Sequence, residues 1–193
     1  MLRVEMDRTD IPNAGPGETA ATINALATPA LLHDKDRLDG NLARLSYRMA
    51  RQGVVLRPHM KAAKSIDVAR RVYPSGVGPI TVSTLAEAEY FAQHGFRDIT
   101  YAVGLAPHTA ARAMRLRKAG IDLKVLLDSS EQAIILGAAG RAAGVIPSAF
   151  IEIDCDGHRG GLTATDPKLI AVAAAVAEAG VDLVGILTHA GES

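Results

Sequence analysis

The sequence has little that could cross-link it or build a large aromatic core. Cys155 is the single cysteine among 193 residues, so no disulfide can form within the chain and no cysteine-rich zinc cluster is possible. Tryptophan is absent, and aromatic residues make up only 4% of the chain. The core must therefore consist mainly of aliphatic side chains, which is typical of helices packed on a parallel sheet.

The chain also lacks an excess of charge of either sign. Lys and Arg number 21, as do Asp and Glu, which gives a formal net charge of zero. This balance argues against a nucleic-acid-binding protein driven by bulk positive charge. No apolar run is long enough to span a bilayer, and the N-terminal stretch lacks the apolar core of a signal peptide. We therefore expect a cytoplasmic protein that binds neither nucleic acid nor membrane.

The chain divides into an irregular start and a regular remainder. Residues 1–26 are rich in Gly, Pro and polar residues and are predicted to form an N-terminal arm. After them, short apolar runs alternate with helical segments, and Thr84-Leu-Ala-Glu87 fits a capping box at the start of a helix. The predicted strands are 28–34, 54–61, 78–84, 98–104, 122–128, 148–156 and 181–189.

Strands that alternate with helices predict βαβ units and a parallel α/β sheet. Such units could form a doubly wound open sheet or most of a (β/α)8 TIM-type barrel. The first predicted strand is not followed by Gly-x-Gly-x-x-Gly, and the chain has no Gly-Lys-Ser/Thr phosphate loop, which weakens the nucleotide-binding open sheet. In a barrel, polar inward-facing residues collect at the carboxyl ends of the strands, where active sites lie.

Basic and titratable residues alternate along the predicted strand 54–61. Arg57, His59 and Lys61 stand two residues apart, and side chains two apart in a strand point to the same face. The pattern predicts that they line one face near the barrel mouth. Two alternatives without a catalytic role stay open. Lys61 could be a solvated surface charge, and His59 could be a packed side chain with a hydrogen-bond partner.

Two later strands carry titratable groups to the same expected rim. Acidic residues alternate at 152, 154 and 156, the loop after them holds Arg159, and His189 stands at the end of the last predicted strand. Charges brought together at one rim can shift one another's pKa, which is typical of a catalytic site. Arg159 could instead simply pair with Asp154 or Asp156.

Several segments together resemble a known enzyme family. They are TPALLHDKDRLDGNLARL, LRPHMKAAKS, ITVSTLAEAEYFAQHG, IEIDCDGHRGGL and THAGES, in this order. They resemble the N-terminal barrel of the D-threonine aldolase and D-serine dehydratase family. This family is a branch of the fold-type III, alanine racemase-like enzymes that use pyridoxal 5′-phosphate (PLP). The Arg-Pro-His-x-Lys segment is the most specific part of the resemblance.

The resemblance implies a set of site residues. Lys61 would form a Schiff base with PLP, which acts as the electron sink. Arg57 and His59 would support the cofactor and its lysine, and Arg159 would face the nitrogen of the pyridine ring. A guanidinium there would keep that nitrogen unprotonated, because arginine does not readily lose its proton.

Two further residues complete the implied site. His189 is a candidate acid/base group or cofactor contact, and Tyr101 could lie near the ring. The implied catalytic residues are therefore Lys61 and His189. The implied cofactor-binding residues are Lys61, Arg57, His59, Arg159 and Tyr101, and no metal ligand is expected in this chain.

The function that the resemblance implies is a PLP-dependent lyase acting on D-amino acids, of the D-threonine aldolase or D-serine dehydratase type. A PLP-dependent racemase and a non-catalytic PLP-binding protein stay open as alternatives. One departure concerns the segment Lys61-Ala-Ala-Lys64, where relatives usually have Lys-Thr-His-Lys. The substrate therefore cannot be carried over from the family.

The second departure is length. A complete (β/α)8 barrel typically has about 250 residues, whereas the predicted strands of residues 27–193 number seven. We expect an alanine racemase-type barrel that stops after its seventh strand, without the C-terminal β domain of the family. The full-length enzyme would be a homodimer that needs a divalent metal, Zn or Mn. The 193-residue chain alone would bind PLP weakly or not at all and would be inactive as a lyase.

Overall fold

A computed structural model describes residue 29 and residues 32–191. The chain forms two compact units, the first containing residues up to Leu56 together with Ser65–Gly76 and the second containing Arg57–Lys64 together with Val77 onward. The arm predicted for residues 1–26 lies outside the described residues. The predicted extent of the barrel domain, 27–193, stays a prediction.

The first unit is helical. Helix α1 covers Lys35–Arg51 and helix α2 covers Ile66–Val72. Asp34 caps α1 by accepting a hydrogen bond from the Arg37 N–H at 3.0 Å. The strand predicted over 28–34 is not formed in its described residues 32–34, because they make the extended entry into α1 instead.

The strand predicted over 54–61 is also not formed as a strand. Its ladder is reduced to one isolated parallel bridge, between His59 and Thr81. Pro58 has no N–H to donate to a ladder, and Val54 and Val55 are 52% and 78% exposed. The segment therefore joins the sheet only at its last residues, where the Met60 N–H donates to the Thr81 carbonyl at 2.8 Å.

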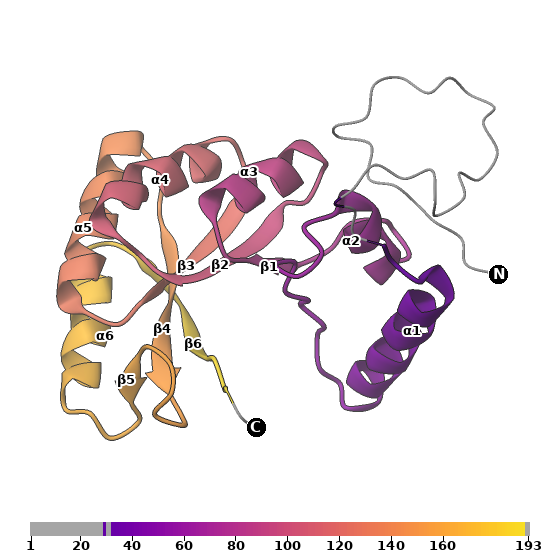
Figure 1. The fold of residues 1–193 in the computed structure, drawn as a ribbon. Helices are drawn as coiled ribbons and strands as arrows, with labels where there is room; N and C mark the ends of the chain where they lie inside the picture. The colour runs from indigo at the N-terminus through magenta and orange to yellow at the C-terminus, as the bar shows by residue number, and fades with distance from the viewer. Residues whose placement is uncertain (1–28, 30–31, 192–193) are drawn as a thin grey trace. The chain divides into compact units, whose positions relative to one another are not determined.

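The second unit contains a sheet whose strands are all parallel (Figure 1). Neighbouring strands follow the order β1-β2-β3-β4, and both β5 and β6 pair with β4. The strand bounds are β1 Ile80–Val82, β2 Asp98–Gly104, β3 Asp122–Leu127, β4 Ser148–Asp154, β5 Leu162–Thr163 and β6 Asp182–Thr188. The five strands predicted from residue 78 onward are therefore confirmed, and β5 is an addition.

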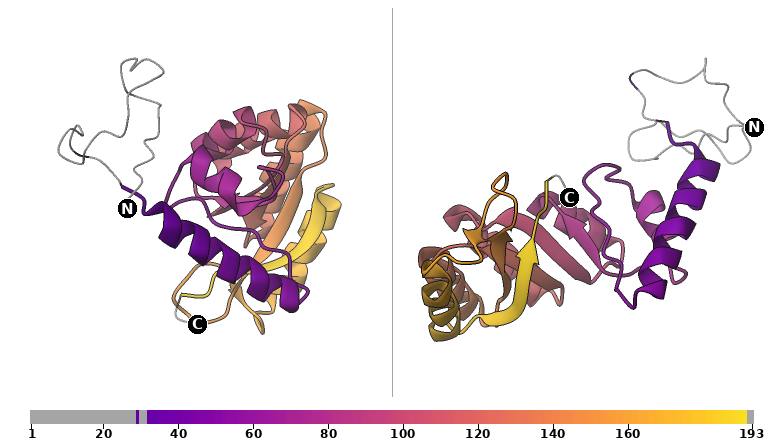
Figure 2. Two further views of the ribbon diagram at one scale, coloured as in Figure 1. Left: turned by 90° about the vertical axis from the view of Figure 1, so that its right-hand side faces the viewer. Right: turned by 90° about the horizontal axis from the view of Figure 1, so that it is seen from below.

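Helices connect the strands and lie along one side of the sheet (Figures 1 and 2). Their bounds are α3 Leu85–Gln93, α4 Ala110–Lys118, α5 Ser130–Ala143 and α6 Lys168–Glu178, with a short 3-10 turn η2 at Pro107–Thr109. This is the predicted βαβ arrangement of a parallel barrel wall. Among the described helices, none is both long enough and apolar enough to cross a membrane.

The sheet has one apolar face and one mixed face. Registered rows such as Ile80–Ile99–Leu123 share a face because parallel partners point the same way, and all three are fully buried. This apolar face packs against the helices. The opposite face carries polar side chains such as Thr100 and Lys124, as expected for the interior of a barrel.

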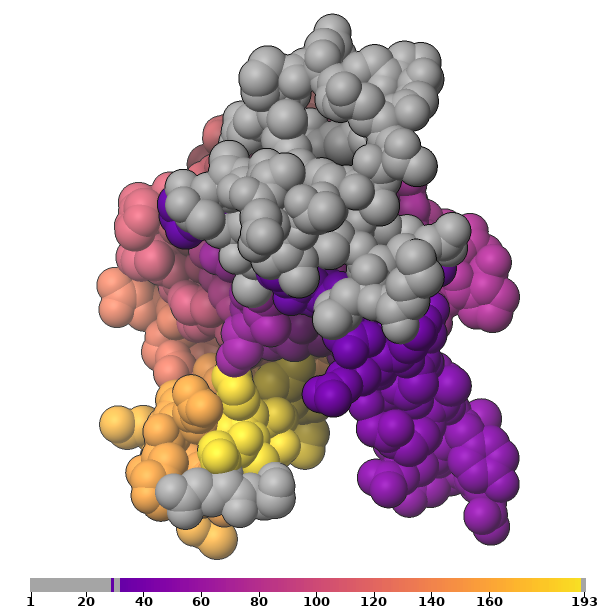
Figure 3. Space-filling model, turned by 45° about the vertical axis from the view of Figure 1, so that its right-hand side comes forward, coloured from indigo at the N-terminus to yellow at the C-terminus, as the bar shows by residue number. Residues whose placement is uncertain are grey.

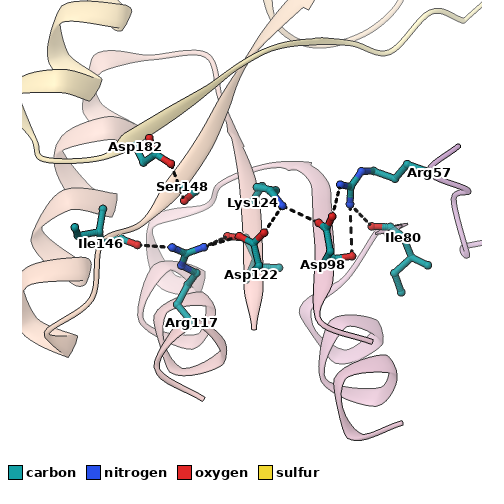
Figure 4. A network of polar contacts seen from close by, with 10 residues as sticks. Arg57, Ile80, Asp98, Arg117, Asp122, Lys124, Ile146, Ser148 and Asp182 are labelled. Atoms are coloured by element: carbon teal, nitrogen blue, oxygen red, sulfur yellow. Dashed lines mark hydrogen bonds and ion pairs between the residues drawn. The ribbon is translucent and has the colours of Figure 1, made fainter. Parts of the chain in front are cut away.

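A chain of ion pairs joins the amino ends of the strands (Figure 4). Arg57 Nη2 lies 2.8 Å from Asp98 Oδ2, and Lys124 Nζ lies 2.7 Å from Asp98 Oδ1. Lys124 also pairs with Asp122, whose other oxygen accepts from Arg117 Nη1 at 2.9 Å. Asp98 and Asp122 are the first residues of β2 and β3. The bottom of the barrel wall is therefore tied together by alternating charges.

Substitution of Gly137 tests the packing of α5 on the segment that follows α6. A Cβ at this position would lie 2.8 Å from the Ala179 Cβ and clash with the Ala179 carbonyl. We expect Gly137→Ala to cost about 1–3 kcal/mol of unfolding free energy. Gly40→Ala in α1 is the control, since its Cβ would find its nearest neighbour at 4.0 Å and should stabilise the helix by roughly 0.5–1 kcal/mol. Urea unfolding of both variants measures the difference.

Candidate functional site

Lys61 lies at the carboxyl end of the short stretch that runs beside β1. Pro58 accepts a hydrogen bond from the Thr81 N–H at 2.9 Å, and the chain then continues past Met60 to Lys61. The Lys61 side chain is exposed, and it takes part in no ion pair with another described residue. An exposed amine at this rim is available to a ligand from solvent.

His59 connects Lys61 to the end of β1. Its Nδ1 accepts a hydrogen bond from the Lys61 backbone N–H at 3.3 Å, and its Nε2 lies 3.4 Å from Ser83 Oγ. Burial lowers the pKa of His59, and the Lys61 charge lowers it further, against an opposing effect of Glu87. His59 is therefore a neutral imidazole at pH 7, with its proton on Nε2 facing Ser83.

The loop after β4 and the end of β6 come together at the same rim. Gly191 N–H donates to Asp156 Oδ2, and the space beside the Gly191 Cα is lined by Arg159 and His158. Figure 3 shows the yellow residues of β6 lying against the orange residues of this loop. This contact places His189, which follows β6, close to Arg159.

Positive charges surround His189. Burial lowers the pKa of His189, and the charges of Arg159 and Lys61 lower it further, while Asp156 acts to raise it. The structure thus brings Lys61, His59, His189 and Arg159 together, as the sequence predicted. These four residues are called the rim cluster below.

Acidic residues of β4 serve mainly to shape this rim. Asp154 Oδ1 accepts from the Gly157 N–H at 2.8 Å and turns the loop back. Glu152 is buried beneath it, and burial raises its pKa, with further increases from the charges of Asp128 and Asp154. Gly161, with φ of 106°, crosses so close to the Glu152 carbonyl that a Cβ would lie 2.7 Å from it.

The structure does not bring Arg57 or Tyr101 into the rim cluster. Arg57 Nη1 donates to the carbonyl of Ile80, at the amino end of β1, and Nη2 pairs with Asp98. Tyr101 shares a row with Val82 and is 7% exposed, so it belongs to the apolar face that packs on the helices. Burial there raises the pKa of Tyr101.

Two residues of the site were not singled out as functional from the sequence. Lys64 Nζ lies 3.2 Å from Glu87 Oε1, and Glu87 Oε2 accepts from the Ser83 N–H at 2.8 Å. The capping-box pattern had marked Glu87 as a helix residue, and Thr84 Oγ1 does accept from the Glu87 N–H at 3.0 Å. Its reciprocal bond goes to Ser83 rather than Thr84, which ties the helix cap to the rim cluster.

The lowered pKa of His59 predicts a loss of stability in acid. An unfolded histidine binds its proton at its ordinary pKa of 6.5, whereas folded His59 resists protonation. Stability is therefore complete above pH 6.5 and falls as the pH drops toward the folded pKa. Unfolding free energies at pH 7.5 and 5.5 should differ less in His59→Gln than in the wild type. His108→Gln, an exposed histidine outside the cluster, should follow the wild type.

No group of three or more metal-binding side chains occurs within residues 32–191. This finding concerns only the part of the chain that the structure describes, so the metal expected for the whole enzyme stays a prediction.

The model of the alanine racemase N-terminal domain matches residues 33–193. The chain belongs to this family, and the predicted alanine racemase-type barrel fold is confirmed.

The relatives include enzymes with lyase names. D-threo-3-hydroxyaspartate dehydratase of Delftia sp. (strain HT23) is 47% identical over 173 residues, which cover 89% of this chain and 46% of that protein. 3-Hydroxy-D-aspartate aldolase of Paracoccus denitrificans is 31% identical over 185 residues, covering 94% of this chain and 46% of that protein. The chain therefore spans about half the length of the curated relatives it matches.

A solved structure of a variant of the D-threo-3-hydroxyaspartate dehydratase in the metal-free form superposes with a TM-score of 0.83. It is 46% identical and the match covers 88% of this chain and 45% of that one. The resemblance to the D-threonine aldolase and D-serine dehydratase family of fold-type III proteins is confirmed by these relatives.

Proposed function

We propose that the protein carrying this chain is a PLP-dependent lyase that acts on D-3-hydroxy amino acids. The observation that carries this proposal is the rim cluster, in which an exposed lysine lies among two neutral histidines and an arginine. The names of the relatives give the reaction class, and their substrates suggest the substrate class.

The donor set of the rim cluster fits PLP. The cofactor needs a primary amine for covalent attachment and cationic groups for its negative charge, and Lys61 and Arg159 supply these types of group. PLP, when bound, supplies an electron sink for the bond that is broken at the substrate's α-carbon. Lys61 would hold it, and Arg159 would face its ring.

The other residues of the site would transfer protons and orient Lys61. His189 is neutral at pH 7 because its pKa is lowered, so its imidazole can accept a proton from a substrate and return it. His59 would orient Lys61 through the backbone hydrogen bond to its Nδ1. Arg57 would support the segment that carries Lys61 through its ion pair with Asp98, at the amino end of the strands. Tyr101 would affect the cofactor site only indirectly, from the face of the sheet that packs on the helices.

Product analysis distinguishes the candidate reactions. A dehydratase releases a 2-oxo acid and ammonia from D-threo-3-hydroxyaspartate or D-serine, whereas an aldolase releases glycine and an aldehyde. A racemase instead inverts only the α-carbon and so produces the L-configured amino acid, whereas a non-catalytic binding protein forms none of these products. We expect lyase products with D-3-hydroxy substrates and none with their L enantiomers. If inversion at the α-carbon were the only reaction, the protein would be a racemase and the proposal would be wrong.

We also propose a requirement for a divalent metal, zinc or manganese, because a solved structure of a relative is of the metal-free form. Dialysis against EDTA should reduce turnover to about a few per cent or less, because a bound divalent metal would supply Lewis-acid chemistry to the whole enzyme. Added Zn²⁺ or Mn²⁺ should restore it, while the visible absorbance of bound PLP persists throughout. Full turnover after chelation would contradict this requirement.

A homodimer in the cytoplasm completes the proposal. The single cysteine suits a reducing compartment, since no disulfide within the chain is needed. Sedimentation of the protein purified with its cofactor measures the oligomeric state.

A further inference from the structure

The turn after His59 carries two lysines, and they have different surroundings. Lys61 is exposed without a carboxylate partner among the described residues, whereas Lys64 lies 3.2 Å from a carboxylate oxygen of Glu87. Either amine could in principle react with the carbonyl group of a cofactor, because both stand on the same short turn. The surroundings of the two amines must therefore determine which of them reacts.

Lys64 is held in an unusual backbone conformation. Its φ of 49° makes it the one non-glycine residue with positive φ in the part of the chain that is described. Such a conformation is strained for a residue with a side chain, and it persists where the surroundings enforce it. Here the Lys64 N–H donates to the Met60 carbonyl at 2.9 Å, and the side chain reaches Glu87.

Glu87 is the buried centre of this arrangement. It is 8% exposed, and its Oε2 accepts from the Ser83 N–H at 2.8 Å. Oε1 lies 3.2 Å from the Lys64 ammonium, whose charge compensates the burial of this carboxylate oxygen. Burial acts to raise the pKa of Glu87, but the Ser83 bond and the Lys64 charge outweigh it, and the pKa lies below its ordinary value.

The same carboxylate is linked to Lys61 through two contacts. Ser83, which Glu87 holds by its backbone, places its Oγ 3.4 Å from His59 Nε2. His59 in turn accepts the N–H of Lys61 at Nδ1. Glu87 therefore anchors both ends of the turn from His59 to Lys64.

We propose that Glu87 is a positioning residue that selects Lys61 over Lys64 as the reactive lysine, by holding the Lys64 side chain in an ion pair and fixing the turn between them. An amine held by a carboxylate must give up that contact before it can react with a carbonyl group, whereas Lys61 has no such contact to give up. The selection between lysines is a property of the chain itself. Its role in attaching PLP rests on the proposed function.

Glu87→Gln tests the charge while keeping the helix cap. The chain itself contains the needed precedent, because Gln132 caps α5 by accepting from the Asp128 N–H at 2.7 Å and the Ser129 N–H at 3.2 Å. Glu89→Gln is the matched control. Glu89 stands on the same helix and loses an ion pair with Arg112, 2.6 Å long, without touching Lys64.

The first measurement needs no cofactor. Reductive methylation of the protein, with site-resolved mass spectrometry, reports the reactivity of each lysine amine. In Glu87→Gln the rate at Lys64 should rise about two- to fivefold, the range that an exposed ion pair allows. Glu89→Gln should match the wild type. An unchanged rate at Lys64 in Glu87→Gln would overturn the proposal.

The second measurement traps PLP with borohydride and maps the label. The wild type should carry it on Lys61, and Glu87→Gln should divide it between Lys61 and Lys64. Label confined to Lys61 in both proteins would overturn the selection by Glu87. Absence of label from both lysines in the wild type would instead refute the proposed function, while the methylation rates still decide the role of Glu87.

Discussion

Lys61→Ala is expected to abolish covalent attachment of PLP and to lower turnover by at least about a thousandfold. Lys61 is the exposed amine of the rim cluster, and its charge acts on both His59 and His189. Under the proposed function, removal of the amine would leave PLP without its covalent anchor. The visible absorbance band of the purified protein and its turnover measure the two losses.

Lys64→Ala is the matched control for this prediction. It removes an amine from the same turn but leaves Lys61 and its contacts with His59 in place, so a borohydride-stable label should persist on Lys61. The assignment of Lys61 would be wrong if peptide mapping of the wild type placed the label on Lys64, or if Lys61→Ala retained the band.

Much of the sheet could be predicted from local pattern. The apolar run 98–104 is strand β2, Asp98–Gly104, because residues 99–101 are buried whichever face they point to and its ends carry polar or glycine residues. The run 54–61 has a comparable pattern but forms one bridge only. A strand forms only where neighbouring strands can pair with it, and its own sequence does not identify those neighbours. In addition, Pro58 has no N–H to donate to a ladder. Pairing is a non-local property, and here pattern alone was insufficient.

The site could be predicted in part for a similar reason. The rule that polar residues gather at the carboxyl ends of barrel strands correctly brought Lys61, His189 and Arg159 to one rim. The alternation that grouped Arg57 with Lys61 identifies a shared face, but not a shared end. Side chains four residues apart along a strand are separated by about 13 Å, and Arg57 accordingly contacts the opposite end of β1.

The contribution of Glu87 was hidden by its second role. The sequence pattern explains this carboxylate fully as a helix cap, so nothing in the pattern called for a further function. Its contact with Lys64 depends on a positive φ at a lysine, which no propensity rule predicts. Residues that serve both a cap and a site are therefore difficult to recognise from sequence alone.

Asp98→Ala is expected to destabilise the second unit by about 2 kcal/mol. The Asp98 carboxylate binds Arg57 with one oxygen and Lys124 with the other, at 2.8 and 2.7 Å. Lys124 is only 12% exposed, so removal of the carboxylate leaves partly buried cations close together. The cost stays below the 3–5 kcal/mol of a fully buried pair because Asp98 itself is 38% exposed and water screens it.

Acid titration gives this prediction a second test. Burial acts to raise the pKa of Asp98, but the hydrogen bonds and charges of Arg57 and Lys124 outweigh it, so the pKa lies below its ordinary value of 3.8. A carboxylate with a lowered pKa stabilises the fold above the unfolded pKa and loses that contribution as the pH falls through the folded pKa. The difference in unfolding free energy between the wild type and Asp98→Ala should therefore be full at pH 7 and shrink below pH 3.8.

Asp122→Ala is the control, because its carboxylate is 54% exposed and Lys124 keeps Asp98 as a partner. We expect Asp122→Ala to lower the unfolding free energy by less than Asp98→Ala does. If both variants lost the same amount, the prediction that Asp98 is the main link in the chain of ion pairs would be wrong.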